Sequence, residues 1–249
     1  MKSKATHKCL YGIHSVKEAL IANKRNFSRI FVNQNSRNSR LAEIIEMARK
    51  RRIDISQVSS TKLSNLAQHE DHQQIVAHVS SLPLVEIRQM THTHAFIIIC
   101  DQIMDPHNMG AIIRTSLAAG ATGLITTKDN STPLSATVSK ISSGAMEHLP
   151  IARVTNLVRC IDTLKSGGVW VSGLDAHASL SLHDARFDPP VALIIGSEQK
   201  GIRRLVCENC DQMIHIPQMG PLDSLNASVA AGIAMYEVFR QRKYARSCS

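Results

Sequence analysis

The sequence predicts an α/β protein with a small N-terminal α/β module and a larger C-terminal domain that contains a parallel sheet. Beyond residue 94, short apolar runs alternate with helical stretches, as they do where parallel strands are covered on both faces. Within the first 80 residues, short strands and helices alternate in a more basic sequence. Pro83 and the charged and polar residues around it indicate a linker. We therefore divide the chain into a module over residues 1–80, a linker over 81–93 and a second domain over 94–249.

The N-terminal module is predicted from hydrophobic periodicity. Its clearest element is a helix over Arg40–Arg52, in which Leu41, Ile44, Ile45 and Ala48 share one face. The other elements are shorter and are predicted from local runs. They are helices over Ser15–Ala22 and Thr61–Gln68, and strands over Arg29–Val32, Ile53–Val58 and Gln74–Val79.

The second domain is predicted from short, continuous apolar strands with longer helical stretches between them. Because strands and helices alternate, the sheet is expected to be parallel. Strands are expected over Phe96–Cys100, Gly123–Thr126, Val169–Gly173 and Val191–Ile195, and helices over Met109–Ala119, Leu134–Ser142, Thr155–Lys165 and Ala227–Arg242.

Composition and charge narrow the class of protein. No apolar run approaches the ~18 residues of a membrane span, and no apolar core follows the basic N-terminus, so we expect neither a membrane protein nor a secreted one. Six cysteines in an unexported chain indicate reduced thiols and a cytoplasmic protein. Residues 1–80 carry 14 Lys and Arg against 6 Asp and Glu, nearly all of the net charge of +9. This asymmetry is typical of a polyanion-binding module, although a solvated surface gives the same charge.

A first polar motif, DPHNMG from Asp105 to Gly110, follows one predicted strand and precedes a helix. It therefore lies at the carboxyl end of a parallel strand, where open α/β sheets bind ligands. Asn108 is expected at the N-cap of the helix, with its side chain available to backbone N–H groups or to a substrate. Arg114 follows in the second turn. Taken alone, these residues are better explained by a cap and a surface arginine.

Two further motifs lie near the C-terminus. GSEQKG, from Gly196 to Gly201, follows a strand, and its glycines let the backbone approach a bound group closely. This spacing is a weak signal alone, and it differs from that of a dinucleotide-binding fold, which disfavours an oxidoreductase. Ser224-Leu-Asn226 precedes the last helix, where polar residues cap the helix or hold a ligand against free N–H groups.

In this order and at these intervals, the three motifs closely resemble those of the SpoU/TrmH family of RNA ribose 2'-O-methyltransferases. The resemblance covers residues 96–242. More weakly, YGIHSVKEAL (Tyr11–Leu20) and HQQIVAHV (His72–Val79) resemble the small N-terminal domain of the members that act on ribosomal RNA. The greatest likeness is to members that methylate a guanosine ribose in bacterial large-subunit ribosomal RNA. Gln74 departs from the related pattern, which often has glycine there.

The resemblance implies a C-terminal SPOUT domain whose last segment forms a deep trefoil knot. It implies S-adenosyl-L-methionine as the methyl donor, held by Gly196, Ile216 and Leu225, largely through backbone groups. It also implies a homodimer that packs at the knot, and an RNA substrate, ribosomal RNA in the first place, that the N-terminal module binds. Neither a membrane nor a metal ion is expected.

The resemblance also assigns catalytic residues. They are Arg114, Asn108, Glu198, Ser224 and Asn226. Arg114 would lie nearest to the chemistry, and the other four would build the pocket and hold the nucleotide and the methyl donor. Alignment of the reacting groups would supply several kcal/mol, with an upper range of ~7–11 kcal/mol. Because a guanidinium is a poor base at neutral pH, Arg114 either acts as a base in a perturbed, dry pocket or stays charged and stabilises the developing alkoxide.

Three other functions are compatible with parts of the sequence. A non-catalytic RNA-binding or ribosome-assembly factor on the same scaffold would tolerate loss of Arg114 or Asn108, yet both residues are present. A transfer-RNA ribose 2'-O-methyltransferase would carry the same three motifs. A different α/β enzyme with a nucleotide cofactor is disfavoured by the missing glycine fingerprint.

Two clusters that resemble metal sites are interpreted otherwise. HEDH, from His69 to His72, has neither the H-E-x-x-H nor the H-x-x-E-H order and indicates a polar loop. CENC, from Cys207 to Cys210, is a single CxxC without further Cys or His partners. We therefore expect two thiols near a helix end and no metal site.

Overall fold

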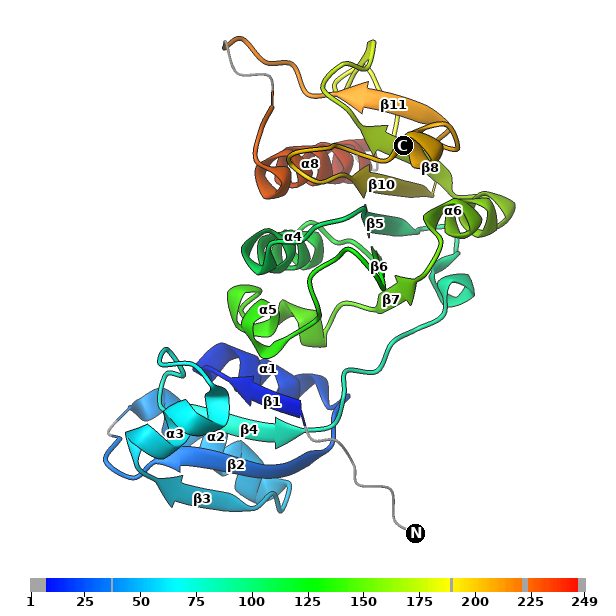
Figure 1. The fold of residues 1–249 in the computed structure, drawn as a ribbon. Helices are drawn as coiled ribbons and strands as arrows, with labels where there is room; N and C mark the ends of the chain where they lie inside the picture. Colours follow the sequence, from blue (N-terminus) through cyan, green and yellow to red (C-terminus); the bar gives the residue numbers. More distant parts are fainter. Residues whose placement is uncertain (1–7, 37, 189, 221–223, 246–249) are drawn as a thin grey trace. The chain divides into compact units, whose positions relative to one another are not determined.

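The structure, a computed structural model, describes residues 8–36, 38–188, 190–220 and 224–245. Its contacts divide the chain into two units (Figure 1). The N-terminal unit comprises Met1–Pro83 and Leu134–His148, and the C-terminal unit comprises Leu84–Pro133 and Leu149–Ser249. Residues 134–148 thus pack with the N-terminal module, although the sequence places them in the middle of the second domain.

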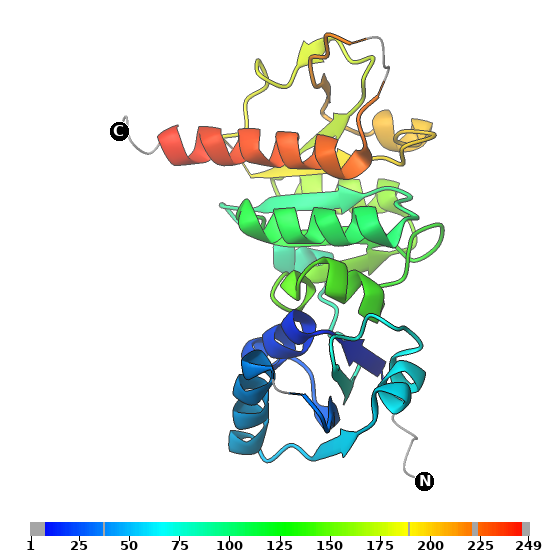
Figure 2. The same cartoon turned by 90° about the vertical axis from the view of Figure 1, so that its left-hand side faces the viewer.

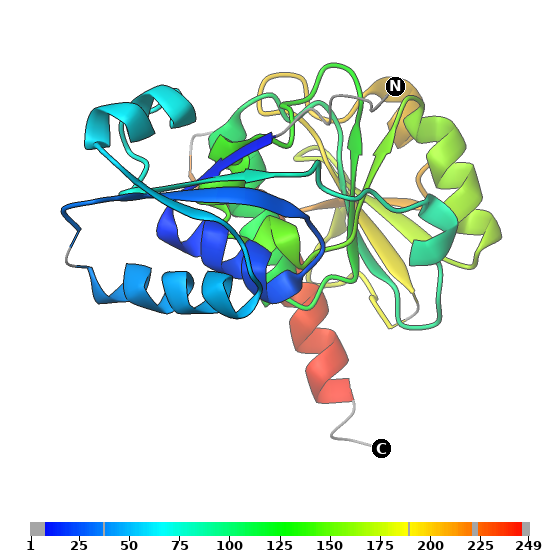
Figure 3. The same ribbon diagram turned by 90° about the horizontal axis from the view of Figure 1, so that it is seen from below.

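A four-stranded sheet in the order β1-β4-β2-β3 lies at the centre of the N-terminal unit. β4 pairs in the antiparallel sense with β1 and β2, and β2 pairs in parallel with β3. Helices α1 and α2 cover one face of the sheet and α3 covers the other (Figure 3). The elements are β1 (Lys8–Tyr11), α1 (Ile13–Ala22), β2 (Phe27–Asn33), α2 (Ser39–Lys50), β3 (Ile55–Val58), α3 (Ser60–Ala67), β4 (Ile75–Val79), α5 (Ala136–Ile141) and the 3₁₀ turn η2 (Ala145–Glu147).

The predicted helices of this module are confirmed within a few residues. Leu41, Ile44 and Ala48 are buried on the inner face of α2, as the periodicity predicts. The helix begins after Asn38, whose Oδ1 accepts a hydrogen bond from a backbone N–H of the first turn. Strand β1 was not predicted from the sequence, because its four residues begin with Lys8 and give no clear alternation of burial.

The turn before β4 explains why the related pattern often has glycine at the position of Gln74. Gln73 and Gln74 both have left-handed backbones, with φ of 50° and 65°. Glycine adopts this region without the steric cost that a Cβ brings, on the order of 1 kcal/mol. The side chain of Gln73 accepts a hydrogen bond from the backbone N–H of Ile13 at 3.0 Å, which ties the turn to the start of α1.

Residues 134–148 are held in the N-terminal unit through charged side chains. The carboxylate of Glu147 accepts hydrogen bonds from Nε and Nη2 of Arg25 at 2.7 and 2.8 Å, and both side chains are buried. Burial raises the pKa of Glu147, and the Arg25 charge opposes that increase. A hydrogen bond between Glu18 Oε2 and His148 Nε2, at 2.7 Å, adds a second contact.

The described part of the C-terminal unit is built on a seven-stranded sheet in the order β7-β6-β5-β10-β8-β11-β9. Every pairing in this sheet is parallel, which confirms the predicted sheet type. The elements are η1 (Ile87–Met90), β5 (Phe96–Cys100), α4 (Pro106–Ala118), β6 (Gly123–Thr127), β7 (Ile151–Val154), α6 (Leu157–Ser166), β8 (Trp170–Leu174), β9 (Leu180–Ser181), β10 (Val191–Ile195), α7 (Arg204–Cys207), β11 (Gln212–His215) and α8 (Ala227–Ala245).

Helices cover both faces of this sheet. α4 and α8 lie side by side on one face, and α6 packs on the other (Figures 1 and 2). The central strands β5 and β10 are buried along their whole length, as continuous apolar runs predict. Among the helices in the described ranges, none combines the length and the hydrophobicity that a membrane crossing requires.

Candidate functional site

The candidate site lies at the carboxyl edge of the parallel sheet. Strands β5 and β10 are adjacent, and their last residues, Cys100 and Ile195, are in register. The loops that follow these strands therefore leave the sheet next to each other. In open α/β sheets this edge is where ligands bind. The topology thus brings the first two motifs, which are almost 90 residues apart in the sequence, to one place.

The loop after β10 is a tight turn that depends on its two glycines. Ser197 and Gly201 exchange backbone hydrogen bonds of 3.1 and 2.8 Å across the turn. A Cβ at Gly196 would lie 2.2 Å from the carbonyl carbon of Gly201 and 2.3 Å from the backbone nitrogen of Ile202. Gly201 itself has a left-handed φ of 63°. Gly196 is therefore required by close backbone approach and Gly201 is favoured by its backbone conformation.

Three of the predicted site residues meet at one carboxylate oxygen. Oε1 of Glu198 accepts hydrogen bonds from Asn108 Nδ2 at 2.8 Å and from the backbone N–H of Ala227 at 3.3 Å. It also accepts a hydrogen bond from Asn226 Nδ2, which in turn donates to Asn108 Oδ1 at 3.1 Å. The side chains of Asn108, Glu198 and Asn226 thus join the loop after β10 to the first turns of α4 and α8. We call these three residues the Glu198 network.

The capping roles differ in part from the prediction. Asn226 accepts hydrogen bonds from backbone N–H groups of the first turn of α8 and caps it, as expected. The N-cap of α4, however, is Asp105, so the predicted cap role of Asn108 is wrong. The helix begins at Pro106, a residue suited to the first helical position, and this places Asn108 inside the first turn, where it is buried. Arg114 accordingly lies in the third turn.

An ion pair between buried Asp101 and exposed Arg203, at the same edge of the sheet, was not predicted from the sequence. Asp101 follows β5 directly and is fully buried. Its carboxylate accepts hydrogen bonds from the backbone N–H and the guanidinium of Arg203, at 3.0 and 2.9 Å. The pair holds the end of the Gly196–Gly201 turn against the end of β5. The sequence does contain one signal for this pair: an acidic residue directly after a buried strand is itself expected to be buried and therefore to need a partner.

The turn Gly196–Gly201 after β10 is called the Glu198 loop. A first cavity, of about 430 Å³, lies on one side of this loop. Gly196, Ile216 and Leu225, the residues expected to hold a cofactor, all line it. Ser224 also lines this cavity; its side chain is exposed and takes no part in the Glu198 network. We call this first cavity the Leu225 cavity. Its other linings include Leu174, Asp175, Ala176, His177, Ile195, Ile202, Ile214, Gln218 and Ala230.

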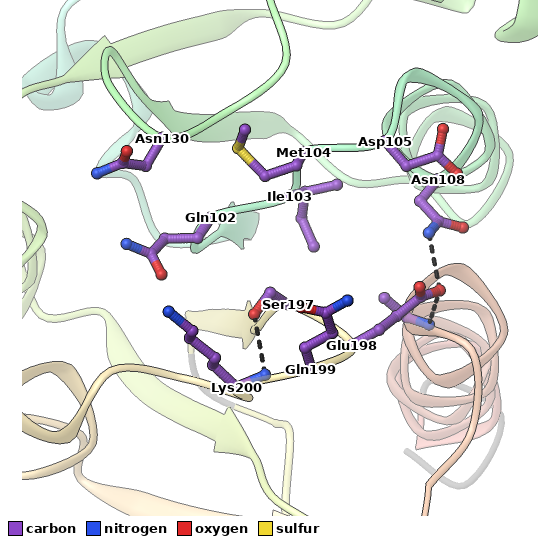
Figure 4. A pocket seen from close by; sticks show the side chains of 11 residues that line it. Gln102, Ile103, Met104, Asp105, Asn108, Asn130, Ser197, Glu198, Gln199 and Lys200 are labelled. Atoms are coloured by element: carbon purple, nitrogen blue, oxygen red, sulfur yellow. Dashed lines mark hydrogen bonds between the residues drawn. The ribbon is translucent and has the colours of Figure 1, made fainter.

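A second cavity, of about 500 Å³, lies on the other side of the same loop (Figure 4). Gln102, Met104 and Asn130 form one wall, and the Glu198 loop forms the opposite wall. Asn108 lies at one end of the cavity, beside Glu198. We call it the Asn130 cavity. The residues that line both cavities are Ser197, Glu198, Gln199, Lys200 and Ala227.

Arg114 stands apart from these groups. Its side chain is exposed and lines neither cavity. At 3.6 residues per turn, six residues rotate the side chain by about 240° from Asn108, so the two point in directions about 120° apart. Within the described ranges no hydrogen bond or ion pair engages its guanidinium. The structure of one chain therefore brings together three of the five predicted catalytic residues and does not add Arg114 to them.

The described residues contain no group of three or more His, Cys, Asp and Glu placed to hold a metal ion. Cys207 and Cys210 are free thiols at and just beyond the end of α7. Burial raises the pKa of Cys210 to about 12, so this thiol stays protonated near neutral pH.

Comparison with models of known protein families shows to which family the chain belongs. The profile described as the SpoU rRNA Methylase family matches residues 95–236, more than half of the sequence. The chain belongs to this family. Residues 9–85 match a second profile, described as RNA 2'-O ribose methyltransferase substrate binding. The family resemblance read from the three motifs is therefore confirmed.

Individual relatives agree with the family assignment. The chain is 39% identical over 242 residues to a Bacillus subtilis (strain 168) protein provisionally named TrmH family tRNA/rRNA methyltransferase YacO, covering 95% of this chain and 96% of the relative. The fold of the present chain is similar to that of the SpoU methyltransferase AviRb from Streptomyces viridochromogenes in complex with AdoMet, with a TM-score of 0.84 and 23% identity. The match covers 98% of this chain and 93% of AviRb. A TrmH/SpoU tRNA modifying enzyme from A. aeolicus matches with a TM-score of 0.56, 28% identity and coverage of 64% and 82%. The protein is an RNA methyltransferase of the SpoU/TrmH family.

Proposed function

We propose that the protein transfers a methyl group from S-adenosylmethionine to a ribose 2'-hydroxyl of RNA, and that its target is a guanosine of large-subunit ribosomal RNA. The observation that carries this proposal is the Glu198 network. Hydrogen bonds from Asn108 and Asn226 fix the carboxylate of Glu198, and Glu198 lines both of two cavities that share one wall. A bimolecular group transfer needs this arrangement, because its two substrates must meet at one boundary.

The Leu225 cavity suits S-adenosylmethionine. Its volume of about 430 Å³ falls within the range of about 300–1,000 Å³ of small-molecule sites. Because Gly196 has no Cβ, its backbone packs directly against that of Gly201 and Ile202, and all three residues line the cavity. Ile216 and Leu225 supply apolar surface for an adenine ring, and the AdoMet complex of the AviRb relative supports this choice of ligand. When bound, the sulfonium supplies an electrophilic methyl group.

The chain's own residues would align the reaction and manage charge. With three donors on Oε1 of Glu198, the loop that separates the cavities is held in one position. A fixed loop orients the incoming ribose hydroxyl, which is a large part of what enzymes contribute to such transfers. Ser224, at the mouth of the Leu225 cavity, would hold the nucleotide or the methyl donor by its hydroxyl. Arg114 would stabilise the developing alkoxide as a cation, while a phosphate or water accepts the proton.

Replacement of Arg114 by lysine tests this role. Arg114→Lys keeps the positive charge and loses the planar fork of donors, so methyl transfer is expected to fall about 100-fold or more. Affinity for S-adenosylhomocysteine should stay within about twofold, because Arg114 lines neither cavity. Single-turnover methyl transfer and calorimetry measure the two quantities. Near-normal turnover of the variant would remove Arg114 from the mechanism.

A homodimer would explain why Arg114 faces away from the Glu198 network of its own chain. Val229, Ile233 and Tyr236 recur at i, i+4 and i+7 along α8 and are 49%, 39% and 51% exposed. The neighbouring helix α4 adds exposed Leu117 beside Arg114. A second copy packed on this apolar face would bury it and would bring Arg114 toward the site of the partner. An apolar face of this kind on a soluble protein typically marks an interface.

A charge placed on this face is expected to separate the copies. Ile233→Glu should convert a dimer into a monomer of about 27.4 kDa in sedimentation velocity at micromolar concentration. Leu205→Glu is the matched control, because Leu205 is also exposed but lies on α7. Ile233→Glu should lose methyl-transfer activity together with the dimer, whereas Leu205→Glu should keep both. A wild-type protein that sediments as a monomer would contradict the proposal.

The N-terminal unit would bind the RNA. Its match to a substrate-binding profile and the concentration of positive charge in residues 1–80 both support this role. The choice of ribosomal RNA and of guanosine rests on the resemblance of the N-terminal and catalytic sequences to family members with that target. We also propose a cytoplasmic location, which is in keeping with an RNA substrate. The trefoil knot remains part of the proposal and rests on the family resemblance; the strand order shows only that the chain crosses from β11 back to α8, which packs against β10.

Two measurements test the function directly. Calorimetric titration with S-adenosylhomocysteine should show micromolar binding, whereas a well-folded protein that gives no heat would favour a non-catalytic assembly factor. Mapping of 2'-O-methylation across total RNA, with and without the gene, should show one lost signal at a guanosine of large-subunit ribosomal RNA. A signal lost from transfer RNA, with ribosomal RNA unchanged, would overturn the choice of substrate.

A further inference from the structure

We propose that the Asn130 cavity receives the target nucleotide and that the side-chain amides of Gln102 and Asn130 read the edge of its base. The inference rests on the proposed methyl transfer and adds the site at which the enzyme selects its nucleotide. It assigns a function to two residues that belong to none of the three motifs.

The position of the cavity is the first argument. A ribose 2'-hydroxyl can meet a methyl group held in the Leu225 cavity only from a space that adjoins the same wall. The Asn130 cavity is such a space, because Glu198 and Ala227 line both cavities. Asn108, at the other end of the Glu198 hydrogen bond, also lines it. Its volume of about 500 Å³ lies within the range of sites that hold small molecules, so one unstacked nucleotide can enter.

The chemistry of the wall opposite Glu198 is the second argument. Gln102 and Asn130 each present an amide, which can donate and accept hydrogen bonds in one plane (Figure 4). Asparagine and glutamine use this pairing to recognise base edges. In the described part of the chain neither amide has another partner. Met104, beside them on the same wall and 63% exposed, offers a soft apolar surface to the face of a base.

The backbone of this wall is the third argument. Gln102 and Asn130 both have left-handed backbones, with φ of 61° and 53°, which is uncommon for residues other than glycine. The carbonyl of Ile103 holds the two loops together by accepting hydrogen bonds from Thr132 N–H at 2.9 Å and Ser131 Oγ at 3.3 Å. The two amides are therefore presented from a cross-linked platform. Preorganised side chains of this kind characterise recognition sites.

The Glu198 loop supplies a positive charge that can bind the phosphate of the nucleotide. Lys200 lines the cavity on the wall opposite the amides, with no ion pair within the described ranges (Figure 4). Its ammonium can neutralise a phosphate that flanks the target ribose. The base would thus lie against Gln102 and Asn130, the ribose beside Glu198 and Asn108, and a phosphate near Lys200.

Glycine substitutions test the reading of the base. Gln102→Gly and Asn130→Gly delete the amides and keep the left-handed backbone, which glycine adopts freely, so the loops should fold. The full-length protein is given short transcripts that surround the mapped target nucleotide and carry each of the four bases at that position. Both variants should lose about 10- to 100-fold in kcat/KM for the preferred base and at least about tenfold in the discrimination between bases.

The matched control is Asp129→Gly. Asp129 is exposed, precedes Asn130 in the same loop and lines neither cavity, so its variant should discriminate between bases as the wild type does. Affinity for S-adenosylhomocysteine should be unchanged in all three variants. Unchanged discrimination in both cavity variants would overturn the inference and leave methyl transfer intact. A wild-type protein that binds S-adenosylhomocysteine but methylates none of the transcripts and no RNA would overturn the proposed function and this inference with it.

Discussion

The Gly196→Ala variant is expected to lose binding of S-adenosylhomocysteine by about 100-fold, equivalent to about 2.7 kcal/mol. The added Cβ would meet three backbone atoms of Gly201 and Ile202 between 2.2 and 2.4 Å away. Backbone atoms cannot rotate aside as the end of a flexible side chain can, so the turn must open. Opening it would break the Ser197–Gly201 bridge and move Glu198, which the proposed mechanism requires in place.

The control for this change is Gly201→Ala in the same turn. No atom lies within 4 Å of a Cβ built at Gly201, and only its φ of 63° opposes a side chain. That variant should lose on the order of 1 kcal/mol of stability and less than about tenfold in affinity. Isothermal titration calorimetry and thermal unfolding of both proteins separate the steric effect from the conformational one. Equal affinity in the Gly196→Ala variant and the wild type would show that this turn is not a wall of the ligand site.

Sequence periodicity predicted the parts of the fold in which burial is uniform. Strands β5 and β10 are covered on both faces, and their boundaries match the apolar runs over Phe96–Cys100 and Val191–Ile195. The edge strand β9 and its neighbour β11 were missed, because both are largely only partly buried and β11 (Gln212–His215) begins and ends with a polar residue. Strand β7, also at an edge, is four residues long and was absorbed into the region between two helices.

The candidate site was predictable as far as the parallel sheet determines it. Once the strands are parallel, the residues that follow them share one edge, and this argument alone brings Asn108 toward Glu198. The detailed geometry was not predictable. The exchange of cap roles between Asp105 and Asn108 depends on a helix start three residues earlier than its apolar pattern indicates. The position of Gln102 in the wall of the Asn130 cavity depends on a left-handed backbone, which the residue type does not predict.

The packing of residues 134–148 is the largest difference from the sequence-based division. The family profile runs without interruption over residues 95–236, yet this segment shares its contacts with the N-terminal unit. The segment packs against α1 and β1, and the buried pair of Arg25 and Glu147 adds a contact between charged side chains. Two charges of opposite sign, 122 residues apart, give no local pattern from which a sequence could predict their contact.

Removal of one partner of that pair is expected to destabilise the N-terminal unit by about 3–5 kcal/mol. Arg25→Met leaves Glu147 buried without its counter-charge, and an uncompensated buried carboxylate is costly. Arg29→Met is the control, because the Arg29–Asp54 pair, at 3.5 Å, is solvent-exposed and should contribute less than about 1 kcal/mol. Urea unfolding, followed by circular dichroism, measures both. A similar loss in the two variants would contradict the assigned role of burial.

The pH dependence of the loss identifies its cause. Burial raises the pKa of Glu147 above its ordinary value even with Arg25 present, and without Arg25 the pKa should rise further. A carboxyl group with a raised pKa in the folded state binds its proton more tightly there than in the unfolded state, so stability increases as the pH falls. The deficit of Arg25→Met should therefore shrink between pH 7 and the ordinary pKa of glutamate, near 4.5. In the double variant Arg25→Met, Glu147→Leu, no buried charge remains, so most of the stability should return and this pH dependence should disappear. A deficit that stays constant over that range would instead indicate lost packing of the arginine side chain, because packing carries no proton.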